Sequence, residues 1–80
     1  MSRYFFDYLS SDDTLRDYEG RLFRTIRAAY EHADLIAIHL QYDPDCAYSG
    51  WSIVVRDALG AKIYDVPVPP PEPGSNVVLI

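Results

Sequence analysis

Residues 25–42 read TIRAAYEHADLIAIHLQY, and this stretch decides the fold. The chain has neither Gly nor Pro between Gly20 and Pro44, so the whole stretch can be helical. Thr25 is a suitable N-cap, and Pro44 ends the helix. Apolar residues recur at the spacing of one helical face, which predicts a helix packed on a sheet. They are Ile26, Ala29, Tyr30, Ala33, Ile36, Ala37 and Leu40.

Four β-strands are expected around this helix, two on each side in the sequence. In the first, aromatic residues alternate with other side chains: Tyr4, Phe6 and Tyr8 share one face, and Phe5, Asp7 and Leu9 share the other. The expected strands are residues 3–9, 14–17, 51–57 and 61–66. The order ββαββ predicts an α+β two-layer sandwich, with one long helix on a mostly antiparallel sheet.

The C-terminal part differs in composition from the rest. Residues 1–66 are predicted to form the single α+β domain, and residues 67–76 a proline-rich spacer that favours polyproline II. The last four residues form an apolar segment that we expect to dock on a sheet or on a partner. These residues are Val77, Val78, Leu79 and Ile80.

Composition limits the functional class. The chain has 80 residues and a formal net charge of −5, which disfavours nucleic-acid binding. Cys46 is the only cysteine, which fits a reducing compartment, and no signal peptide or membrane span is expected, so the predicted localisation is cytoplasmic. A domain of this size has a small core, and a partner chain is one way to stabilise it.

Several segments resemble a family of short proteobacterial proteins of unknown function. The similarity includes the opening residues 2–7 (SRYFFD), the element Asp17-Tyr18-Glu19-Gly20, the helix alanines and the closing hairpin at 52–66. It extends over about residues 2–66, and the chain departs from the family pattern at Ser2 and Thr25. The resemblance implies the same fold, and it implies no activity, because the family has no assigned catalytic residues.

No residue set predicts catalysis or metal binding. Cys46 lies near carboxylates at a helix C-terminus, which does not activate a thiol. His32 and His39 are separated by about 10.5 Å along a helix, too far to share a metal. Asp17 and Glu19 could act as an acid/base pair, but such residues are also common in turns. We therefore expect no catalytic residues, no metal and no cofactor, and the sequence favours a non-enzymatic role.

The helix ends carry charges that oppose the helix dipole. Arg21, Arg24 and Arg27 surround the N-terminus, whereas Asp43 and Asp45 follow the C-terminus. The arginines could form a small-anion site together with the free N–H groups of the first turn. Alternatively, their side chains extend into solvent or Arg27 pairs with a glutamate one turn later.

A second apolar stripe lies opposite the first. It consists of Leu35, Ile38 and Tyr42, and a helix lying on a sheet needs only one apolar face. An antiparallel pair of helices crossing near Leu35 would place Arg27 of one chain opposite Asp43 of the other. This arrangement predicts a C2 homodimer, whose interface would consist of Arg27, Leu35, Ile38, Tyr42 and Asp43, with the C-terminal segment Val77–Ile80 as a further contact.

The sequence thus leads to three functional hypotheses. The first is a non-enzymatic, homo-oligomeric protein-interaction or structural module. The second is an antitoxin-like regulator that masks an unidentified protein partner, and the third is a small-anion binder at the helix N-terminus.

Overall fold

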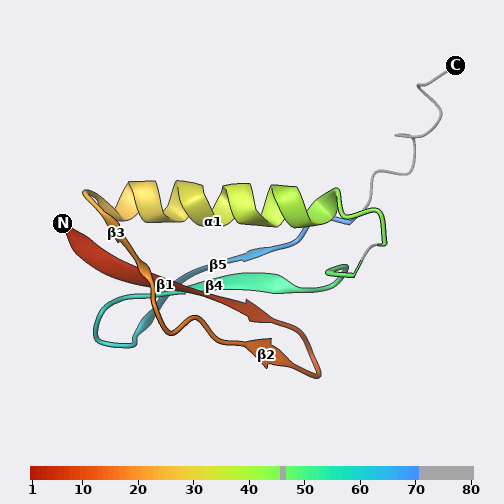
Figure 1. The fold of residues 1–80 in the computed structure, drawn as a ribbon, viewed down its shortest axis with the longest axis horizontal. Helices are drawn as coiled ribbons and strands as arrows, with labels where there is room; N and C mark the ends of the chain where they lie inside the picture. The colour runs from red at the N-terminus through yellow and green to blue at the C-terminus, as the bar shows by residue number, and fades with distance from the viewer. Residues whose placement is uncertain (46, 71–80) are drawn as a thin grey trace, which may run out of the picture.

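The computed structural model describes residues 1–45 and 47–70. It contains one helix and five strands, and the predicted α+β class is confirmed. Helix α1 lies along one face of an antiparallel sheet (Figure 1). The elements are β1 (Ser2–Leu9), β2 (Thr14–Leu15), β3 (Arg21–Phe23), α1 (Ile26–Gln41), β4 (Ser52–Arg56) and β5 (Lys62–Pro67).

Strand β1 organises the sheet, whose order is β2-β1-β4-β5. One edge of β1 pairs with β4, so that Phe6 lies opposite Val55. The other edge pairs with β2 near its end and with β3 near its start. The remaining strand, β5, pairs with β4 and forms the far edge of the sheet.

Alternating side chains of the strands form the core against α1. Phe6, Ile53 and Val55 face the helix and are buried. Ala29 and Ala33 are fully buried on the helix side, and their small side chains allow close packing on the aromatic and branched residues of the sheet. Burying one such branched side chain contributes roughly 1.5–3 kcal/mol, so a few residues account for much of the stability.

The ends of the helix agree with the sequence prediction. The Thr25 hydroxyl accepts a hydrogen bond of 3.1 Å from the backbone N–H of Ala28, which is an N-cap. The helix ends at Gln41, with Tyr42 as the C-cap. Ile26 differs from the prediction, because its side chain is 46% exposed and lies at the margin of the core rather than within it.

The sheet has one strand more than the sequence predicted. The expected return strand at 14–17 is only Thr14–Leu15, and β3 was not expected. The chain leaves β1 after β2, turns at Asp17–Gly20 and then pairs with β1 again as β3. The pairing along this edge of β1 is interrupted at the turn because the Asp17 carboxylate, rather than the backbone of a neighbouring strand, accepts a hydrogen bond from β1.

The last strand continues beyond the expected domain boundary at residue 66. Pro67 pairs with Ser52, which an edge strand permits because the missing N–H is not needed by another strand. Val68 is buried, and its N–H donates a hydrogen bond of 2.8 Å to the carbonyl of Trp51. The Gln41 side chain also donates to the carbonyl of Pro70, at 2.9 Å.

Two sequence predictions fall on residues outside the described part of the chain. These are the state of Cys46 and the docking of the segment Val77–Ile80. Within the described part, no helix is both long enough and apolar enough to cross a membrane.

Candidate functional site

The Asp17 carboxylate shapes the Asp17–Gly20 loop by accepting hydrogen bonds from three backbone N–H groups. Asp17 accepts hydrogen bonds from Phe6 at 3.1 Å and from Glu19 and Gly20 at 3.0 Å each. Burial alone would raise the pKa of Asp17, but these hydrogen bonds lower it below its ordinary value. Because both oxygens are occupied, Asp17 is a structural anion here rather than one half of an acid/base pair.

Gly20 is required at the end of this loop. Its φ of +68° lies in the left-handed region, and an added Cβ would lie 2.7 Å from the carbonyl oxygen of Tyr4. The loop therefore packs directly on the backbone of β1.

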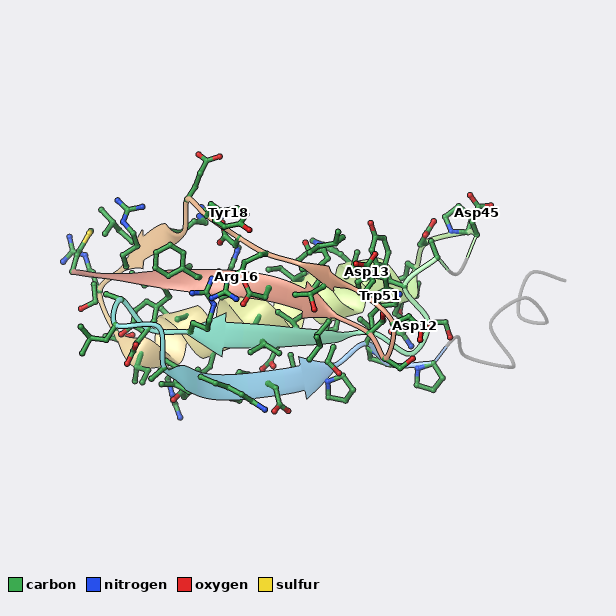
Figure 2. The ribbon with its side chains drawn as sticks, turned by 90° about the horizontal axis from the view of Figure 1, so that it is seen from below. Asp12, Asp13, Arg16, Tyr18, Asp45 and Trp51 are labelled. Atoms are coloured by element: carbon green, nitrogen blue, oxygen red, sulfur yellow. The ribbon has the colours of Figure 1, made fainter. Side chains whose placement is uncertain are left out.

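An ion pair lies on the face of the sheet away from α1 and forms hydrogen bonds with the backbone of the loop. Arg56 forms two hydrogen bonds to Asp7, at 2.6 and 3.1 Å, and a third to the backbone carbonyl of Asp17 at 3.1 Å. Asp7 in turn accepts from the N–H of Asp17 at 2.9 Å. Figure 2 views the molecule from this side, with α1 behind the strands.

The pKa values of Asp7 and Arg56 shift in the directions that favour the charged form of each, as expected for an ion pair. Burial would raise the pKa of Asp7, but the hydrogen bond from Arg56 and that from Asp17 lower it. The hydrogen bond to Asp7 raises the pKa of Arg56. Asp7 is only 6% exposed, and the hydrogen bonds of the ion pair connect β1, β4 and the loop.

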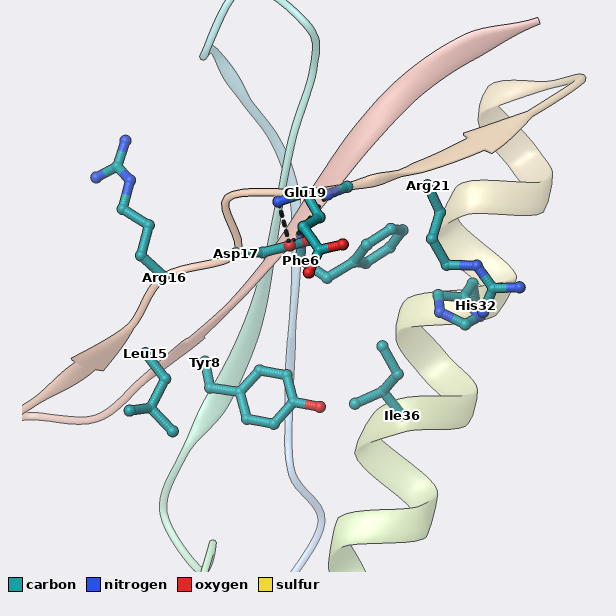
Figure 3. Close-up of a pocket in the computed structure, with 10 residues that line it drawn as sticks. Phe6, Tyr8, Leu15, Arg16, Asp17, Glu19, Arg21, His32 and Ile36 are labelled. Atoms are coloured by element: carbon teal, nitrogen blue, oxygen red, sulfur yellow. Dashed lines mark hydrogen bonds between the residues drawn. The ribbon is translucent and has the colours of Figure 1, made fainter.

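On the other face, the loop forms one wall of an open pocket of about 460 Å³ (Figure 3). The opposite wall is the flank of α1, and strand β1 forms the floor. Side chains from β1, β2 and α1 contribute an apolar surface. They are Phe6, Tyr8, Leu15 and Ile36.

Polar groups surround this apolar surface. Figure 3 places Arg21 on the helix side, beside His32, whereas Arg16 points away from the pocket centre. The His32 ring contacts Phe6 edge-on, with the centroids 4.9 Å apart. Burial and the nearby Arg21 charge lower the pKa of His32 below its ordinary value, which favours the neutral ring. The loop residues Asp17, Glu19 and Gly20 complete the lining.

The outer face of α1 presents the second apolar stripe to solvent. Leu35, Ile38 and Tyr42 are 55%, 43% and 65% exposed, and Arg27 is also exposed. Asp43 is half-buried, and its carboxylate accepts hydrogen bonds from the N–H groups of Asp45 and Ala47.

Charge is separated along the helix axis. Asp12 and Asp13 in the β1–β2 turn and Asp45 in the loop after α1 lie on separate segments towards the same end of the molecule, where α1 finishes (Figure 2). The other end, where α1 begins, carries an arginine-rich segment. It contains Arg21, Arg24 and Arg27.

The anion site predicted at Arg21, Arg24 and Arg27 stays a prediction. Arg21 lines the pocket described above, but Arg24 and Arg27 do not. Within residues 1–45 and 47–70, no group of three or more His, Cys, Asp or Glu side chains could hold a metal ion.

Two features were missed in the sequence. The pocket was missed because it depends on β3. The ion pair was also missed, although Asp7 and Arg56 are charged residues at the apolar strands β1 and β4, a pattern that indicates pairing.

Comparison with known proteins identifies the family. A family model described as a domain of unknown function (DUF6894) matches residues 3–69, and the chain therefore belongs to this family. No curated protein and no solved structure gave a match.

Proposed function

Within this family of unknown function, we propose that the protein is a small non-enzymatic interaction module that forms a homodimer through the outer face of α1. The observation that carries the proposal is the exposed apolar stripe of Leu35, Ile38 and Tyr42. Exposed apolar residues are common singly, but three on one helical line, opposite a complete core face, are what a helix contact requires.

The charge distribution favours a second copy of the same chain as the partner. An antiparallel pair related by a twofold axis near Leu35 would place the arginine-rich end of one molecule against the aspartate-rich end of the other. In that arrangement Arg27 faces Asp43, since each is eight positions from Leu35. Glu31 and His39 are both exposed and lie four positions from Leu35, so they would also face each other.

The size of the stripe sets the expected affinity. A typical specific interface buries about 800 Å² on each partner. Three partly exposed side chains supply only a fraction of this area, so the dimer should have a dissociation constant of about 1–100 μM.

Sedimentation velocity between 1 and 300 μM tests the proposal. The unmodified protein should change from monomer to dimer across this range, and Leu35→Glu combined with Ile38→Glu should remain monomeric. Leu59→Glu is the matched control, because Leu59 is 94% exposed in the β4–β5 turn and receives the same chemical change. A protein that stays monomeric at 300 μM, or a dimer that survives the double substitution, would reject this interface.

A further inference from the structure

We propose that the pocket between the Asp17–Gly20 loop and α1 binds an α-amino acid with an aromatic side chain. This site is separate from the outer face of the helix, so it does not depend on dimer formation. The shape of the pocket and the charged groups at its rim favour such a ligand.

The pocket suits a flat apolar body. Its volume of about 460 Å³ falls within the range of small-molecule sites, and its apolar lining combines two aromatic rings with two aliphatic side chains. Leu15 lies opposite Tyr8 in the sheet and shares the face that points towards α1, yet it remains 47% exposed. A ligand ring placed between Leu15 and Ile36 would cover this apolar surface.

The rim presents one available charge of each sign. Arg21 and Glu19 both line the pocket, and neither forms an ion pair within residues 1–45 and 47–70, where the salt bridges are Arg56–Asp7 and Lys62–Asp65. The Asp17 carboxylate is occupied by backbone N–H groups, and Arg16 points away. A guanidinium and a carboxylate on one segment complement a ligand with both a carboxylate and an ammonium group.

This pairing distinguishes amino acids from simpler ligands. A plain aromatic acid would satisfy Arg21 but leave its own carboxylate near that of Glu19. A plain aromatic amine would satisfy Glu19 but leave its own ammonium group near the guanidinium of Arg21. Only a zwitterion uses both groups, and the open shape of the pocket limits its dissociation constant to about 0.1–1 mM.

Titration of the full ¹⁵N-labelled chain with L-phenylalanine, followed by amide chemical shifts, tests the proposal. The largest shifts should occur at Glu19, Arg21 and His32. Phenylacetate and phenethylamine, which each lack one charge, should bind at least about tenfold more weakly.

Two substitutions assign the charges. Arg21→Gln should weaken the binding of phenylalanine at least about fivefold without changing the binding of phenethylamine. Glu19→Gln should weaken the binding of phenylalanine without changing the binding of phenylacetate. Lys62→Gln, which removes an exposed positive charge of β5 outside the pocket, is the control and should leave phenylalanine binding unchanged. Absence of shifts at 10 mM phenylalanine, equal binding of all three compounds, or an Arg21→Gln variant that binds normally would overturn the proposal.

Discussion

Substitution of Gly20 by alanine tests whether the loop packs on β1 as the structure describes. Two costs are expected. The first is conformational, because an L-residue at φ +68° loses about 1–2 kcal/mol. The second is steric, because the new Cβ would lie 2.7 Å from the Tyr4 carbonyl oxygen and 3.0 Å from side-chain atoms of Arg3 and Phe5.

The steric cost cannot be relieved by rotating a side chain, since the closest atom belongs to the backbone of the central strand. Overpacking of this kind costs about 1–3 kcal/mol. The total loss in the free energy of unfolding is therefore about 2–5 kcal/mol, a large fraction of the stability of a small domain.

Gly50→Ala is a matched control. Gly50 has a φ of +84°, and an added Cβ would meet no atom of the described residues within 4 Å. It should show only the conformational cost of about 1–2 kcal/mol. The difference between the two variants thus isolates the contact with β1.

Urea unfolding, followed by Trp51 fluorescence and by circular dichroism, measures both variants. We expect Gly20→Ala to be less stable than Gly50→Ala by at least about 1 kcal/mol, or about 4–8 °C in Tm. Equal stabilities within about 0.5 kcal/mol would refute the close packing of the loop on β1, and with it the origin of the pocket wall.

Three further predictions concern stability. Asp7 and Asp17 have lowered pKa values in the folded protein, so their stabilising effect is complete above the ordinary pKa of 3.8 and is lost as the pH falls through the folded pKa. Urea unfolding from pH 2 to 7 should show this decline in the free energy of unfolding, and Asp7→Asn should make the decline smaller. At pH 7, Asp7→Ala leaves the Arg56 charge uncompensated and should cost about 3 kcal/mol, whereas Asp7→Leu with Arg56→Met should recover part of this loss; no recovery would argue against a simple ion pair. Thr25→Ala should cost about 1 kcal/mol in thermal unfolding and Thr25→Ser almost nothing, and equal losses would contradict the N-cap.

Local sequence features determined most of the architecture. The helix could be predicted from its apolar period, from Thr25 and from Pro44, because capping and helix termination depend on residues close in the chain. The long strands could be predicted from the alternation of their side chains, which places Phe6 on one face of β1 with Tyr4 and Tyr8. The three buried alanines follow from the same helical period.

Only the tertiary structure shows that the edge strand is divided into β2 and β3, and only the tertiary structure shows the sites that depend on this division. In the sequence, Asp17-Tyr18-Glu19-Gly20 looks like an ordinary turn. What distinguishes it lies in β1, more than ten residues away: one of the three N–H groups that donate to Asp17, and the backbone atom closest to Gly20, belong to that strand. The pairing of Asp7 with Arg56 spans 49 positions, and the pocket needs the loop, β1 and α1 together. Contacts between distant segments carry no periodic signal, so the candidate site became visible only when the chain was folded.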